Sequence, residues 1–147
     1  MIAPLVNNDK GAFAAASWGV ARLGSATMAT RDAACSCGQL QLTAEGDPIR
    51  ISIVPLPGLP APTGSAFGIQ ARFESKHVRV TGRYSNYMRT SDEGEGRTFH
   101  FCPDCGATVF YELSTVPDVV AVPIGAFAEP DFPPPRISVY ESRRHPG

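Results

Sequence analysis

Cys-Ser-Cys-Gly at residues 35–38 and Cys-Pro-Asp-Cys-Gly at residues 102–106 contain all four cysteines of this 147-residue chain. Each stretch offers two thiols to one ion, and two such pairs make a tetrahedral site when a fold brings them together. Zinc accepts four thiolates in this geometry without penalty. The glycine that ends each stretch allows the positive φ that a backbone wrapped around a metal-bound sulfur requires. The sequence therefore predicts one structural zinc ion with four ligands: Cys35, Cys37, Cys102 and Cys105.

Two disulfides are the alternative use of these four cysteines. A Cys-x-Cys pair can hardly close on itself, so both disulfides would have to join one stretch to the other. No convincing secretory context favours such pairing. A closed four-cysteine zinc site has no open coordination position. We therefore expect it to support folding, and we identify neither a catalytic residue nor a binding residue for any other cofactor.

Length and composition predict one soluble domain. The chain has a formal net charge of −1, with 43% hydrophobic and 18% charged residues, which suits a folded protein. There is no lysine or arginine cluster near either cysteine pair, so we expect no nucleic-acid partner. No apolar run approaches the roughly 20 residues of a membrane span. We expect a cytoplasmic protein that does not bind membranes.

The first 27 residues differ from the rest of the chain. They are rich in alanine and glycine and contain no cysteine or clear periodicity. We expect residues 1–27 to be an unstructured leader or the result of a misassigned start, with the domain spanning residues 28–147. A signal peptide with its apolar core at residues 11–21 is the rival interpretation, but Asp9 neutralises the charge of Lys10.

Alternating apolar and polar residues after Cys35 are typical of short, half-buried strands. No segment there shows a sustained period of 3.6 residues. We therefore predict a mainly β, antiparallel single domain. The expected strands cover residues 39–42, 49–53, 67–73, 77–81, 97–101, 108–113, 119–124 and 137–140.

The order of several short motifs resembles the glutathione-dependent formaldehyde-activating (GFA) family, which shares its domain with centromere protein V. The motifs are Cys35–Gly38, Thr63–Gly68, Val80–Gly82, Tyr87 with Arg89–Ser91, Phe101–Gly106 and Ser142–Pro146. The resemblance implies an antiparallel β-tent fold and a structural zinc at the four cysteines. It also implies a second, catalytic zinc and carbon–sulfur lyase chemistry on thiol–aldehyde adducts such as S-hydroxymethylglutathione, with glutathione or another small thiol as partner.

The chain departs from this family at residues 54–62. Members of the family place Cys-His-Cys-x-x-Cys-x-Arg-Arg at the corresponding positions, and three thiolates leave zinc one open position. This chain has Val-Pro-Leu-Pro-Gly-Leu-Pro-Ala-Pro there, which offers no metal ligand. Because its four prolines remove backbone donors and fix φ, we expect an irregular loop that does not bind zinc.

The genetic code offers one explanation of this departure. Val-Pro and Leu-Pro codons read one base later give TNC at positions 54, 56 and 59, and TGC encodes cysteine. These positions match the family spacing, so we hypothesise that two compensating single-base indels, in the gene or in its determined sequence, shifted the frame of nine codons. Genuine loss of the site is the alternative. Two functions therefore remain open: a carbon–sulfur lyase with its catalytic motif missing, and a non-catalytic zinc-stabilised β domain.

Overall fold

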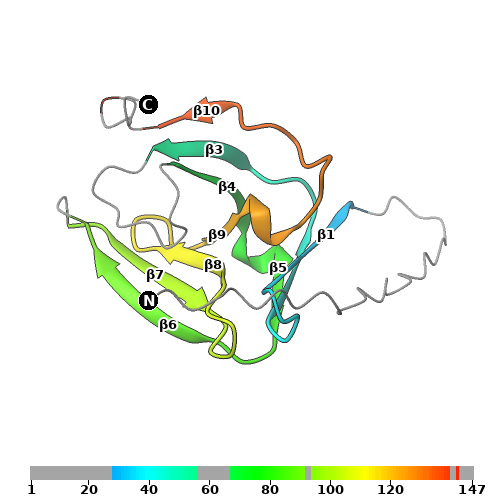
Figure 1. The fold of residues 1–147 in the computed structure, drawn as a ribbon. Coiled ribbons are helices and arrows are strands. Elements are labelled where there is room, and N and C mark those ends of the chain that lie inside the picture. The colour runs from blue at the N-terminus through cyan, green and yellow to red at the C-terminus, as the bar shows by residue number, and fades with distance from the viewer. Residues whose placement is uncertain (1–27, 56–66, 92–93, 140–141, 143–147) are drawn as a thin grey trace, which may run out of the picture.

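A computed structural model describes residues 28–55, 67–91, 94–139 and 142. The predicted leader at residues 1–27 and most of the unusual segment, residues 56–62, lie outside the described residues. The described chain forms two sheets, one of three strands and one of seven (Figure 1). None of its described helices is long and apolar enough to span a membrane.

The smaller sheet has the strand order β1-β2-β5 and is antiparallel throughout. Its strands are β1 (Thr30–Ala34), β2 (Gln41–Glu45) and β5 (Val78–Thr81). Because β1 and β2 pair as a hairpin, the connection between them, residues 35–40, lies at one end of this sheet. That connection carries the first cysteine pair.

The larger sheet has the strand order β10-β3-β4-β9-β8-β7-β6. Two short 3₁₀ helices, η1 (Ser75–His77) and η2 (Ile124–Ala126), follow β4 and β9. The second cysteine pair lies between β7 and β8. The strands are β3 (Arg50–Pro55), β4 (Phe67–Glu74), β6 (Ser85–Thr90), β7 (Gly96–Phe101), β8 (Thr108–Leu113), β9 (Val119–Pro123) and β10 (Ile137–Ser138).

One hydrophobic core joins the two sheets. Leu42 of β2 belongs to the same buried cluster as Phe73 of β4 and Val122 of β9. The Phe73 ring also contacts that of Phe127, with 6.0 Å between the ring centroids. Burial of each such side chain contributes roughly 1.5–3 kcal/mol. Cys35 and Cys102 belong to this cluster as well, so one cysteine of each pair is part of the hydrophobic core.

The prediction of a mainly β, antiparallel domain is confirmed, with two differences. The short strand β10 pairs with β3 in parallel. Two strands, β1 and β6, escape sequence analysis. The sequence of β1 contains no β-branched or aromatic residue except its first threonine, and β6 is an edge strand whose side chains are mostly exposed. Neither strand has the apolar alternation on which strand prediction depends.

Candidate metal centre

The two cysteine stretches fold into turns with closely related backbone hydrogen bonds. In the first, the Cys35 N–H donates to the Leu40 carbonyl at 2.9 Å, and in the second the Cys102 N–H donates to the Ala107 carbonyl at 3.0 Å. Both bonds span five residues, although one pair is Cys-x-Cys and the other is Cys-x-x-Cys. The two turns therefore present their sulfurs in similar ways.

The glycine at the end of each stretch has the conformation that the sequence predicts. Gly38 has φ of 78° and Gly106 has φ of 75°. These values lie in the left-handed region, which other residues enter at a cost. A tight turn behind each cysteine pair therefore depends on glycine.

The four sulfurs converge on one point. The Sγ atoms of Cys35 and Cys37 lie 3.5 Å apart, and those of Cys37 and Cys102 lie 3.6 Å apart. With Cys105 included, all four lie within 4.8 Å of one another. Four thiolates at about 2.3 Å from a tetrahedral ion would be separated by about 3.8 Å. All four cysteines are free of disulfides, and together they can hold one metal ion.

Hydrogen bonds prepare these sulfurs unequally for binding a cation. Burial alone would raise the pKa of Cys102, but hydrogen bonds from the Gln39 side chain and from the N–H groups of Cys105 and Asp104 lower this pKa to about 6. At Cys37, the Gln39 N–H lowers the pKa, but contacts with the neighbouring thiols raise it to about 12. Adjacent thiolates repel one another, so a full set of four requires a cation among them.

A third segment, which sequence analysis did not include in the site, ties the two cysteine turns together. The Gln39 Nε2 donates to the Arg83 carbonyl at 2.7 Å and lies 3.1 Å from the Cys102 Sγ. The Arg83 N–H donates to the Gln39 Oε1 at 3.0 Å, and its guanidinium pairs with Asp104 at 2.8 Å. Gly82, with φ of 96°, allows this approach, because a Cβ there would collide with the Gln39 carbonyl oxygen.

His100 lies near the cysteines in sequence but does not join their cluster. Its ring stacks on Phe110 with 4.3 Å between centroids, and its Nε2 lies 3.2 Å from a carboxylate oxygen of Glu112. Among the described residues, the group that can hold a metal consists of the four cysteines. These contacts give His100 a structural role between β7 and β8.

The prediction of an irregular loop over residues 54–62 is wrong for its first two residues. Val54 and Pro55 belong to β3, where they pair with Gly68 and Phe67 of β4. Residues 56–62 lie outside the described part of the chain.

Together, the sheets and the cysteine cluster define a β domain with a site for one metal ion at the border of its hydrophobic core. A family profile described as "Glutathione-dependent formaldehyde-activating enzyme" matches residues 30–143. The chain belongs to this family.

Among solved structures, the fold is similar to the crystal structure of a Rhodobacter sphaeroides protein. The two chains share 15% sequence identity with a TM-score of 0.52, and the match covers 70% of this chain and 91% of the other. At this identity the likeness concerns the fold. The comparison with curated proteins found no match.

Proposed function

We propose that this chain is a zinc protein of the GFA family. A single structural zinc at the four cysteines would join the β1–β2 connection of the smaller sheet to the β7–β8 connection of the larger one. The observation that carries this proposal is the convergence of four free thiols from two distant turns to within 4.8 Å. When bound, zinc supplies a positive charge that four thiolates share. Cys35 and Cys102 would anchor the ion from the core side, while Cys37 and Cys105 would close it toward solvent.

We further propose that the family's chemistry, carbon–sulfur bond making or breaking in thiol–aldehyde adducts such as S-hydroxymethylglutathione, belongs to a second site that this chain lacks. The segment 54–62 contains no cysteine, histidine or acidic residue, so these residues do not fit a catalytic zinc, and no reaction step follows from them. The alternative function is that of a non-catalytic zinc-stabilised β domain. The absence of metal ligands at residues 54–62 favours this alternative for this sequence.

A restored variant distinguishes the two functions. It combines Val54→Cys, Leu56→Cys and Leu59→Cys with Ala61→Arg and Pro62→Arg, and its matched control carries serine at the three cysteine positions. We expect the restored chain to gain a second zinc and to form S-hydroxymethylglutathione from glutathione and formaldehyde, detected by NMR. The serine control and the unmodified chain should each hold one zinc and lack this activity.

Two results would contradict this proposal. Two zinc ions in the unmodified chain would mean that another ligand set exists. No additional zinc in a folded restored chain would mean that the scaffold does not support the family's catalytic site, so the frame-shift hypothesis would lose its structural basis.

A further inference from the structure

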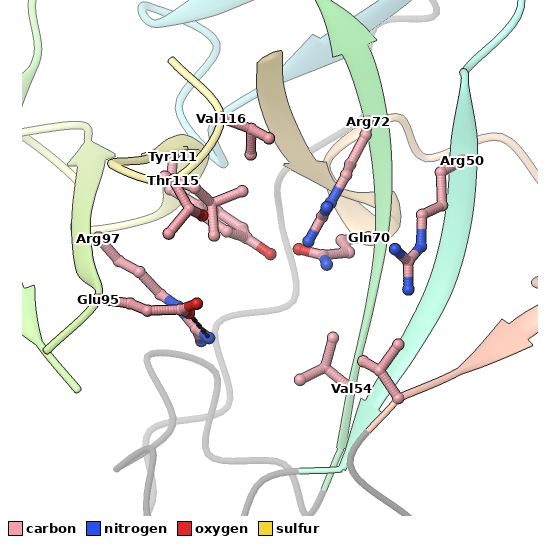
Figure 2. A pocket seen from close by; sticks show the side chains of 11 residues that line it. Arg50, Val54, Gln70, Arg72, Glu95, Arg97, Tyr111, Thr115 and Val116 are labelled. Atoms are coloured by element: carbon pink, nitrogen blue, oxygen red, sulfur yellow. Dashed lines mark ion pairs between the residues drawn. The ribbon is translucent and has the colours of Figure 1, made fainter. Parts of the chain in front are cut away.

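A cavity of about 260 Å³ lies on the face of the seven-stranded sheet that is turned away from the hydrophobic core. Along β4, Gln70 and Arg72 line this cavity, while the alternating residues Ala71 and Phe73 belong to the core. We call this cavity the arginine pocket. Its described lining residues are Arg50, Val54, Gln70, Arg72, Glu95, Arg97, Tyr111, Leu113, Thr115, Val116 and Val139 (Figure 2).

The pocket gathers positive charge in a chain whose formal net charge is −1. Arg50 and Arg72 lie directly opposite one another on paired strands, an arrangement of like charges that is destabilising. Arg97 adds a third guanidinium from β7. Glu95 is the one acidic group among the described lining residues, and it lies 3.9 Å from Arg97. Among the described residues, Arg50 forms no ion pair.

Several polar atoms around the pocket lack partners among the described residues. The Nε atoms of Arg50 and Arg97 are buried without a hydrogen bond, and so is the Oε1 of Gln70. Gln70 is 4% exposed, and its Nε2 donates to the Ser52 hydroxyl oxygen at 3.3 Å. That bond fixes the amide, whose oxygen is turned toward the pocket (Figure 2). Buried polar groups without partners are costly, so this cavity is suited to a ligand that brings both acceptors and a donor.

A tyrosine hydroxyl completes the polar lining. Burial raises the pKa of Tyr111 to about 12, although the charges of Arg97 and Arg72 act in the opposite direction. The phenol therefore keeps its proton at neutral pH and can donate it to an anionic oxygen. Figure 2 shows its hydroxyl pointing toward the Gln70 amide. The side chains of Val54, Val116 and Val139 supply an apolar wall.

We propose that the arginine pocket binds a small organic anion, whose carboxylate or phosphate oxygens contact Arg50, Arg72 and Arg97 and whose hydroxyl or amino group donates to Gln70. Guanidinium groups suit both kinds of oxyanion, because their donors form paired, charge-assisted hydrogen bonds. The proposal goes beyond the zinc function, since no cysteine lines this pocket. The proposal applies to the chain with valine at position 54, because Val54 belongs to the lining and the restored variant would replace it.

The test is calorimetric titration of the zinc-loaded full chain with four probes: malate, succinate, inorganic phosphate and the neutral diamide succinamide. We expect malate to bind severalfold more tightly than succinate, because its hydroxyl can donate to Gln70, and succinamide not to bind. Binding of phosphate in place of both dicarboxylates would support the proposal and identify a phosphate ester as the ligand class. Absence of binding by all three anions would overturn it.

Variants locate the binding site. Arg50→Gln and Arg97→Gln should each weaken malate binding at least about tenfold, the usual effect of losing a charge-assisted hydrogen bond. The matched control is Arg79→Gln, which removes the same charge from an exposed side chain of β5 and should leave the Kd unchanged. Arg50→Lys keeps the charge but loses the paired contact, so it should bind with intermediate affinity; it also keeps the test open if a glutamine variant folds poorly.

An equal loss of affinity in Arg79→Gln would indicate general electrostatic attraction and would contradict a site at the pocket. The same conclusion would follow if folded Arg50→Gln and Arg97→Gln bound malate as well as the unmodified chain. Zinc content measured in the same samples separates this result from any failure of the zinc proposal, because one zinc per chain with no anion binding rejects the pocket alone.

Discussion

The cysteine cluster and the arginine pocket are built from opposite local imbalances of charge. At the cluster, N–H donors from both turns and the Gln39 side chain surround sulfurs that lie within 4.8 Å of one another. At the pocket, three guanidinium groups line one cavity, and Glu95 is the one acidic residue in its described lining. The first arrangement is completed by a cation and the second by an anion. They also differ in their expected effect on stability. We expect the metal-loaded cluster to stabilise the fold by linking the two turns, whereas the like charges of the pocket should destabilise the larger sheet.

Cys102→Ser tests the stabilising side of this comparison and should have the largest effect. Binding free energies of structural zinc are about 10–16 kcal/mol and appear as folding free energy, whereas a domain of this size is stable by about 5–15 kcal/mol. We expect the variant to lose zinc and to be largely unfolded by circular dichroism. Ser36→Ala, an exposed position between two ligands, is the control and should retain both zinc and fold.

Gly82→Ala tests whether the third segment belongs to the cluster. Its Cβ would collide with the Gln39 carbonyl oxygen, and its φ of 96° is unfavourable for alanine. Gly94→Ala is a matched control, since Gly94 has φ of 83° but no atom within 4 Å of the added Cβ. We expect the first variant to lose about 1–3 kcal/mol more stability than the second, measured by urea unfolding of the zinc-loaded proteins. Equal losses of stability in the two variants would show that the segment around Gly82 does not support the metal site.

Gln39→Met tests the hydrogen bonds around the metal. It removes the donor that lies 3.1 Å from the Cys102 Sγ and the two bonds to the Arg83 backbone while keeping a side chain of similar length. Loss of such a partner to a ligand weakens metal binding by about 10–100-fold, so we expect a loss in this range in a chelator competition assay. Gln41→Met is the control: Gln41 is exposed, and its side-chain amide donates to the Gly38 carbonyl. Unchanged zinc affinity in Gln39→Met would show that the Gln39 hydrogen bonds do not contribute to metal binding.

Much of the cluster could be predicted from sequence, because its ligands occur as local pairs whose spacing carries the chemistry. Gln39 and Arg83 were missed, since a glutamine after a cysteine pair and an arginine after a glycine have many ordinary roles. The arginine pocket was missed for a different reason. Its charges come from β3, β4 and β7, where each one has the pattern of a solvent-facing residue on a half-exposed strand. Only the strand order brings them together.

Arg50→Gln tests the pocket's expected cost to the fold. The substitution removes one member of the like-charge pair with Arg72, and such pairs are destabilising by roughly 0.2–1 kcal/mol. Without added anion, we expect the variant to be equally stable or more stable by up to that amount in thermal unfolding at low salt. A clear loss of stability would show that Arg50 supports the fold. It would contradict the claim that the pocket, unlike the cysteine cluster, destabilises the protein.

Removal of residues 1–27 should have the smallest effect. Ala29, just inside the proposed boundary, accepts a hydrogen bond from the Gly46 N–H at 2.7 Å, so the described domain extends to that boundary. We expect a chain starting at Met28 to match the full chain in melting temperature within about 1 °C, in zinc content and in malate affinity. A substantially lower melting temperature would place part of the first 27 residues in the domain.

The most direct test of the central claim is the zinc content of the purified, unmodified full chain, measured by mass spectrometry of the metal together with titration of its thiols. We predict one zinc per chain, bound by four reduced cysteines and released when the thiols are modified. A metal-free folded protein with two disulfides, or a protein that holds two zinc ions, would contradict this account.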